Sequence, residues 1–174
     1  MDINDRDKNT LIKNTNWDKV SNDSLSEHFI GMFFDNLDLV KVTHNSKLSE
    51  TFLCEHADKM FQTPDKVKNE LILINIATHQ KVSEYFVEKY MAEYKFLWSY
   101  LCTFQRFSED FLELHKEDLD WRAVSINQHL SEEFMLKYKT KLYWRGISIN
   151  QGPFSDTFLE KVKDYIDLEA VYPN

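Results

Sequence analysis

Apolar and polar positions along the chain recur in a pattern typical of paired short helices. Each unit opens on a tryptophan or leucine, and an aliphatic residue follows three positions later. A polar gap then leads to a second apolar cluster centred on a phenylalanine. Apolar residues at i and i+3 give a helix one buried face, so we expect two amphipathic helices per unit and an all-α fold. The opening positions are Trp17, Leu39, Leu73, Trp98, Trp121 and Trp144.

A recurring signature of serine, an acidic residue, any residue and phenylalanine marks the second helix of each pair. Successive serines are separated by 23, 34, 25, 23 and 24 residues, so the unit is about 23 residues long with one insertion. A regular period of this length predicts a stacked array. The serines are Ser26, Ser49, Ser83, Ser108, Ser131 and Ser155.

These signatures define the predicted domain organisation. Residues 1–13 form a polar lead-in that we expect to be frayed, and residues 14–174 form a single helical-repeat domain. No unit this short can bury a core alone, so neighbouring pairs must stack into an α-solenoid of six to six-and-a-half repeats. The predicted copies lie near residues 16–37, 38–60, 72–95, 97–118, 120–142 and 143–165, with a half-copy at 166–174.

Polar residues occupy the expected helix ends. Asn16, Asp38 and Asp120 precede first helices and are predicted to cap them, because their side chains can accept hydrogen bonds from free N–H groups. The repeated serine is predicted to cap the second helix in the same way. An asparagine recurs between the helices, where we expect a left-handed backbone conformation that ends the first helix. These asparagines are Asn45, Asn127 and Asn150.

The insertion at residues 58–70 is the main departure from the repeat. Thr63 and Pro64 predict a helix start with proline at its first position, followed by a long helix to about Thr78. Irregular segments of repeat proteins often contact partners, although a neutral expansion is an equal alternative. The candidate binding residues here are Lys59, Phe61, Asp65 and Lys66.

The acids that follow the repeated serine have two interpretations. An acid in the first turn favours helix formation by interacting with the positive end of the helix dipole. The same acids, spaced by the stacking of copies, could instead form a negative stripe that binds a basic surface. These candidate binding residues are Glu27, Glu50, Glu84, Glu109, Glu132 and Asp156.

Residue patterns that would support enzyme chemistry are missing from the sequence. The three glycines stand alone, which excludes a glycine-rich phosphate loop, and no His or Cys spacing matches a metal site. Cys102 falls at a position held by small residues, so it is interpreted as a packing residue. His56 and His115 replace packing aromatic residues of other copies. We therefore expect no enzyme activity, no cofactor and no metal.

Charge and composition narrow the choice of partner. The net charge of −8 argues against direct nucleic-acid binding, which needs clustered Lys and Arg, and favours a protein partner with a basic surface. No apolar run approaches the roughly 18 residues that span a bilayer, so we expect no membrane partner and a cytoplasmic location. Two isolated cysteines fit a reducing compartment.

The unit Trp121-x-x-Val124-Ser125-x-Asn127-Gln128-x-Leu130-Ser131-Glu132-Glu133-Phe134 resembles short helical repeats of bacteriophages, giant DNA viruses and some bacteria. The resemblance covers residues 16–171, departs at the insertion and at Leu39 and Leu73, and implies no particular activity. It suggests a phage-encoded inhibitor, acting in the host cytoplasm, that binds a basic or nucleic-acid-binding surface of a host or defence protein. The alternatives are a structural component of a virion or assembly, and an enzyme with a site near residues 58–70.

Overall fold

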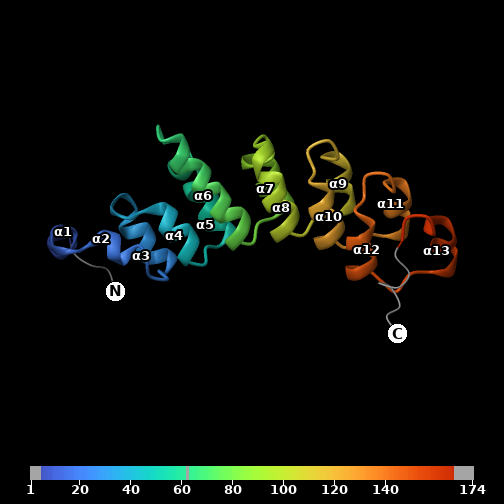
Figure 1. The fold of residues 1–174 in the computed structure, drawn as a ribbon. Coiled ribbons are helices and arrows are strands. Elements are labelled where there is room, and N and C mark those ends of the chain that lie inside the picture. The colour runs from blue at the N-terminus through green and yellow to red at the C-terminus, as the bar shows by residue number, and fades with distance from the viewer. Residues whose placement is uncertain (1–4, 62, 167–174) are drawn as a thin grey trace. The chain divides into compact units, whose positions relative to one another are not determined.

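The computed structural model describes residues 5–61 and 63–166, and every regular element in these ranges is a helix (Figure 1). The predicted all-α fold is therefore confirmed. The chain divides into two compact units, Met1–Ser83 and Glu84–Asn174, each of which is described by itself. None of the described helices has the length and apolar character needed to cross a membrane.

Unit 1 contains two complete helix pairs, a preceding helix and the first helix of the third copy. Its helices are α1 (Asp5–Asn14), α2 (Trp17–Val20), α3 (Glu27–Met32), the 3-10 helix η1 (Phe34–Asn36), α4 (Leu39–Asn45), α5 (Glu50–Phe61) and α6 (Lys66–His79).

Unit 2 begins with the second helix of the third copy and continues through three complete pairs. Its helices are α7 (Glu84–Tyr90), the 3-10 helix η2 (Lys95–Leu97), α8 (Trp98–Phe104), α9 (Glu109–Leu114), α10 (Trp121–Asn127), α11 (Glu132–Lys137), α12 (Trp144–Asn150) and α13 (Asp156–Val162).

Within each unit, equivalent helices of successive copies pack side by side, which is the arrangement of an α-solenoid. In unit 1, α4 packs against α6, and in unit 2, α10 packs between α8 and α12 while α11 contacts α13. The residue after the signature phenylalanine is almost fully buried in the first five copies, whereas Leu159 of the sixth is partly buried. The five buried residues are Ile30, Leu53, Val87, Leu112 and Met135.

Helix starts follow the predicted capping pattern. The side chains of Asn16, Asp38 and Asp120 each accept a hydrogen bond from a backbone N–H of the helix that they precede. Signature serines cap the second helices by accepting the N–H of the phenylalanine three residues later, which satisfies one of the free donors of the first turn. This bond is present at Ser26, Ser49, Ser108, Ser131 and Ser155.

The asparagines at the ends of the first helices do not adopt the predicted left-handed conformation. No described non-glycine residue has a positive φ angle. Instead, the side-chain amides of Asn127 and Asn150 donate to the carbonyls of Ala123 and Gly146, one turn earlier, at 3.0 Å. These helices therefore end on a side-chain bond and an extended residue rather than on a left-handed turn.

The lead-in is more ordered than its polarity predicts. Residues 5–14 form α1, and the carbonyl of Ile12 accepts a hydrogen bond from the Trp17 indole at 3.0 Å. The Lys8 ammonium lies 5.7 Å from the centroid of the Phe33 ring. The same indole bond occurs in copies 5 and 6, where Trp121 and Trp144 donate to carbonyls five residues earlier. The bond between α1 and the first copy is therefore of the same kind as the bond between successive copies.

The insertion lengthens two helices rather than forming a loop. α5 has 12 residues and α6 has 14, whereas the other helices that follow Asn16 have at most 7. The predicted start at Pro64 is wrong by two residues, because α6 begins at Lys66 with Asp65 as its N-cap. Asn69 accepts a hydrogen bond from the Thr63 hydroxyl and donates one to the Thr63 carbonyl, which fixes the turn before the helix.

Candidate functional site

The repeated glutamates connect neighbouring copies. Each carboxylate accepts a hydrogen bond from the backbone N–H of the signature serine in the next copy, and in three pairs also from that serine's hydroxyl. The pairs are Glu27 with Ser49, Glu50 with Ser83, Glu84 with Ser108, Glu109 with Ser131, and Glu132 with Ser155. These bonds lower the pKa of Glu132, the Ser155 hydroxyl being the main cause.

These contacts give the repeated acids a structural use that neither interpretation of the sequence includes. The five glutamates are partly buried, and each bonds outside its own helix, so helix-dipole capping alone is an incomplete account of them. Asp156, the last acid of the series, is exposed. A partner that bound the five glutamates as a stripe would have to compete with the inter-copy hydrogen bonds.

Buried glutamines form a second set of inter-copy bonds. Gln128, only 2% exposed, donates from Nε2 to the carbonyls of Cys102 and Gln105 and accepts the Phe107 N–H at Oε1. Gln80 makes the same three bonds to Thr43, Ser46 and Leu48. One side-chain amide thus bonds to two free carbonyls at the end of a first helix and to one backbone N–H of the segment that follows that helix.

Small residues in the first helices have a related role. The hydroxyl of Ser21 accepts the N–H of Asp38, and that of Ser125 accepts the N–H of Tyr143, each at 2.9 Å. Both serines lie four residues after the opening position of their copy, where copy 4 has Cys102. Burial raises the pKa of the Cys102 thiol to about 12, which suppresses the reactive thiolate, as expected of a packing cysteine.

Polar bonds also link the aromatic residues of unit 2 to the preceding copy. His115 lies against the rings of Trp98 and Phe111, in the aromatic position predicted for it, and its Nε2 is 2.7 Å from Glu88. At the next position along the array, the Tyr138 hydroxyl donates to Glu113. His56 likewise stacks on Phe52 with ring centroids 4.2 Å apart. These histidines therefore serve in packing.

Glu113 is the most strongly perturbed carboxylate among the described residues. Hydrogen bonds from the Lys137 ammonium at 2.8 Å, from the Tyr138 hydroxyl and from Lys116 at 3.3 Å lower its pKa from 4.5 to about 2. Burial and the bond to Glu113 in turn raise the pKa of the Tyr138 hydroxyl. The ionised carboxylate thus joins α9 to α11.

The lowered pKa of Glu113 predicts a loss of stability in acid. Between pH 4.5 and about 2, this carboxyl is protonated in the unfolded chain and ionised in the folded one. Unfolding therefore takes up a proton, and the free energy of unfolding decreases as the pH is lowered. We expect urea-unfolding midpoints of Glu113→Gln to fall less steeply over this window than those of the wild type. Glu117→Gln, a change at a surface acid that pairs with Lys141, is the control and should retain the wild-type slope.

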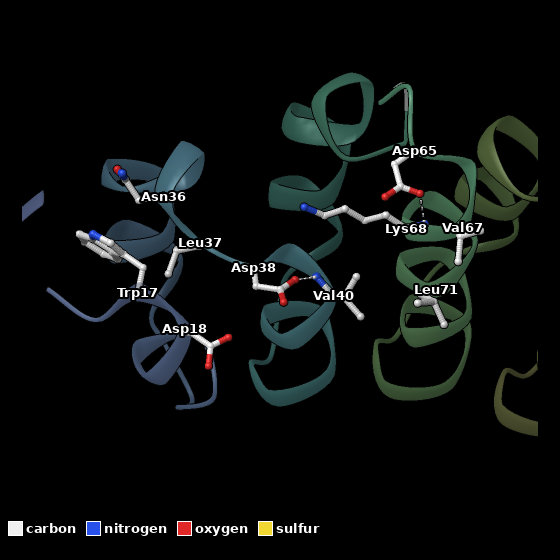
Figure 2. A pocket seen from close by; sticks show the side chains of 10 residues that line it. All are labelled: Trp17, Asp18, Asn36, Leu37, Asp38, Val40, Asp65, Val67, Lys68 and Leu71. Carbon is white, nitrogen blue, oxygen red and sulfur yellow. Dashed lines mark hydrogen bonds between the residues drawn. The ribbon is translucent and has the colours of Figure 1, made fainter.

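An open groove lies on the surface of unit 1. It has a volume of about 490 Å³ and lies where the start of α4 is flanked by α2 and by the extended N-terminal part of α6 (Figure 2). Asn75, on the C-terminal half of α6, donates to the Val40 carbonyl at 2.8 Å and so fixes α6 against α4. The groove is lined by Trp17, Asp18, Asn36, Leu37, Asp38, Val40, Asp65, Val67, Lys68 and Leu71.

The α6 side of the groove displays apolar side chains to solvent. Val67 is 66% exposed and Leu71 is 45% exposed, one helical turn apart. The core face of the same helix is formed by Ile72, Leu73 and Ile76, all buried. The extension therefore carries apolar residues that are not needed for the core, and a pair of such residues beside a groove suits a contact with another molecule.

Three aspartates surround the groove, and each is held in place through one oxygen. Oδ1 of Asp38 accepts the Val40 N–H at 3.1 Å, and Oδ1 of Asp65 accepts the Lys68 N–H at 3.0 Å. Oδ1 of Asp18 pairs with the Lys41 ammonium at 2.6 Å. The groove thus combines fixed negative charge with an apolar wall.

The insertion residues predicted to bind are distributed over different places. Asp65 lines the groove as the cap of α6, and Lys66 is the first residue of that helix and is exposed. Lys59 extends from α5 to within 5.9 Å of the Phe34 ring centroid, and Phe61 is the last residue of α5. Of these four, only Asp65 belongs to the groove.

Within residues 5–61 and 63–166 no group of three or more His, Cys, Asp or Glu side chains could hold a metal ion. No protein-family pattern, curated protein or solved structure shows significant similarity to the chain. The groove and the contacts between copies are therefore the features of this chain that bear on its function.

Proposed function

We propose that this protein is a non-enzymatic protein-interaction module whose partner docks in the groove of unit 1. The main support is the groove itself, in which exposed apolar residues of α6 lie beside three aspartates. In the regular copies the repeated Ser, Glu and Gln residues bond to neighbouring copies. At α6 the apolar residues Val67 and Leu71 remain exposed beside fixed carboxylates.

A partner with a basic surface fits both the net charge of −8 and the aspartates around the groove. The resemblance of the repeat unit to repeats of bacteriophage proteins further suggests that the partner is a host or defence protein, and that the module inhibits it by covering a basic or nucleic-acid-binding surface. The groove carboxylates that would meet such a surface include two helix caps, which makes them rigid contact points.

The test is a comparison of partner capture by two matched variants. Val67→Asp with Leu71→Asp places charge on the exposed wall of the groove and should reduce recovery of the wild-type partner at least about tenfold, because both apolar contacts are lost. Leu114→Asp with Ile149→Asp changes two residues of unit 2 that are 70% and 61% exposed and should leave recovery unchanged. Quantitative mass spectrometry of proteins captured from a lysate of the natural cellular environment provides the measurement. Equal recovery by both variants would contradict the proposal.

Charge reversal of the repeated glutamates is a poorer test. Glu109→Lys or Glu132→Lys would remove the bonds to Ser131 or Ser155 as well as a surface charge. Loss of binding could then result from a disturbed array. The groove variants change side chains whose apolar groups point to solvent and avoid this ambiguity.

A further inference from the structure

We infer that the groove of unit 1 binds a short amphipathic helix that carries arginine or lysine at the edge of its apolar face. This inference rests on the proposed function and specifies the chemistry of the segment that docks. The occupant is a helical segment of a protein partner, held by apolar contacts on one side and by charge-assisted hydrogen bonds on the other.

The apolar requirement follows from the geometry of α6. Val67 and Leu71 lie on successive turns and present a strip parallel to the helix axis (Figure 2). Val40, half-buried at the start of α4, and the buried Leu37 also line the groove. A helix laid along such a strip can place side chains at i and i+3 or i+4 in the groove, which is how this protein packs its own helices.

The basic requirement follows from the aspartates. Asp18, Asp38 and Asp65 each use Oδ1 in a bond within unit 1, and none has a described partner for Oδ2. A carboxylate that caps a helix through one oxygen, as Asp38 and Asp65 do, is pre-oriented, so a cation can bind the other oxygen at a smaller entropy cost. The remaining Oδ2 of each carboxylate can accept a charge-assisted hydrogen bond from an arginine guanidinium or a lysine ammonium.

Two lysines reduce the negative charge of the groove without reversing it. Lys41 is paired with Asp18, and Figure 2 shows Lys68 extending from α6 toward α4. The ammonium of Lys68 forms no ion pair within the described residues, and its long side chain can turn outward when a cation enters. Three carboxylates against two ammonium groups leave the groove net negative, which favours a basic occupant over an acidic one.

The test uses three labelled peptides of about 15 residues, near the length at which isolated amphipathic helices become marginally stable in water. All three carry leucines at helical i, i+3 and i+4 spacing and differ at the flanking positions, which are arginine, glutamine or glutamate. Fluorescence anisotropy with the full chain should show the arginine peptide binding at least about tenfold more tightly than the glutamate peptide, with the glutamine peptide between them.

A set of Asp→Asn changes connects this preference to the groove. Asp18→Asn, Asp38→Asn and Asp65→Asn together remove three charges but keep side chains that can cap helices, as Asn16 does in this chain. The affinity of this variant for the arginine peptide should fall to the affinity of the wild-type protein for the glutamine peptide. Asp110→Asn, Glu133→Gln and Asp164→Asn remove three charges from exposed positions of unit 2 and should not change the peptide order.

The outcomes separate this inference from the proposed function. If all three peptides bind equally and the Val67→Asp, Leu71→Asp variant binds none, the groove is a docking site but the basic preference is wrong. If no peptide binds, or if binding survives the Val67→Asp, Leu71→Asp change, the inferred helix does not occupy the groove. The proposed function is overturned separately, when capture of the natural partner is unaffected by that variant.

Discussion

Gln128→Ala is expected to destabilise unit 2 by about 3 kcal/mol or more, since it leaves three buried backbone groups without partners at about 1–3 kcal/mol each. The lost bonds are those from Nε2 to the carbonyls of Cys102 and Gln105 at 2.8 and 2.9 Å, and from the Phe107 N–H to Oε1 at 3.0 Å. At 2% exposure, Gln128 lies where water cannot easily replace them. Urea unfolding measures the loss.

Local measurements make this prediction specific. Hydrogen exchange of the Phe107 amide should accelerate in Gln128→Ala, because that N–H loses its acceptor. The control is Asn127→Ala, which removes the neighbouring side-chain amide but only a bond to Ala123 in the same helix. An equal loss of stability in both variants would show that the inter-copy bonds of Gln128 add little.

Trp98→Ala should cost about 3–5 kcal/mol, the usual range for removing a large aromatic side chain from a core. Trp98 is 1% exposed, its ring centroid is 6.2 Å from that of Phe111, and its indole donates to the Ala92 carbonyl at 3.2 Å. Alanine would leave a cavity beside the ring of Phe111 and remove that hydrogen bond.

Trp98→Leu provides the matched comparison, because leucine occupies the equivalent position as Leu39 and Leu73, buried in both cases. The leucine side chain fills part of the cavity that alanine leaves, so Trp98→Leu should retain more than half of the stability that Trp98→Ala loses. Thermal unfolding of the two variants under the same conditions measures the difference. If leucine were as damaging as alanine, the indole hydrogen bond, rather than the filled volume, would dominate this position.

The spacing of the repeats predicts the fold well because the residue type at each repeated position is favoured by the structure of a single helix or of its ends. Serine caps, buried residues after the signature phenylalanine and the opening Trp or Leu all reflect preferences of single helices, which a sequence displays directly. The long α6 is predicted, with an end at about Thr78 where the structure has His79, whereas the length of α5 and the exact start of α6 are not. The proline at position 64 indicated a helix start, whereas the actual start depends on Asp65 and on the bonds between Thr63 and Asn69.

The contacts between copies were not predictable from local preferences. Glu109 in the first turn of α9 is already favoured by the helix dipole, so its reach to Ser131 leaves no additional signal in the sequence. The groove is equally hidden, because Asp18 and Leu71 line one depression only when copies 1 and 3 flank α4. One signal was available: Val67 falls outside the apolar register of Ile72 and Ile76, which marks it as a surface residue with an apolar side chain.

The bonds between aromatic residues and the preceding copy have a consequence for how such a chain could evolve. Glu88 is matched to His115 and Glu113 to Tyr138, whereas the equivalent residues of the last pair of copies, Leu136 and Val162, are both apolar. Exchanging or deleting a copy by recombination would set a carboxylate against valine, or leucine against a tyrosine hydroxyl. Each copy of unit 2 is therefore fitted to its own neighbour, and the array would be expected to diversify by point substitution rather than by shuffling its repeats.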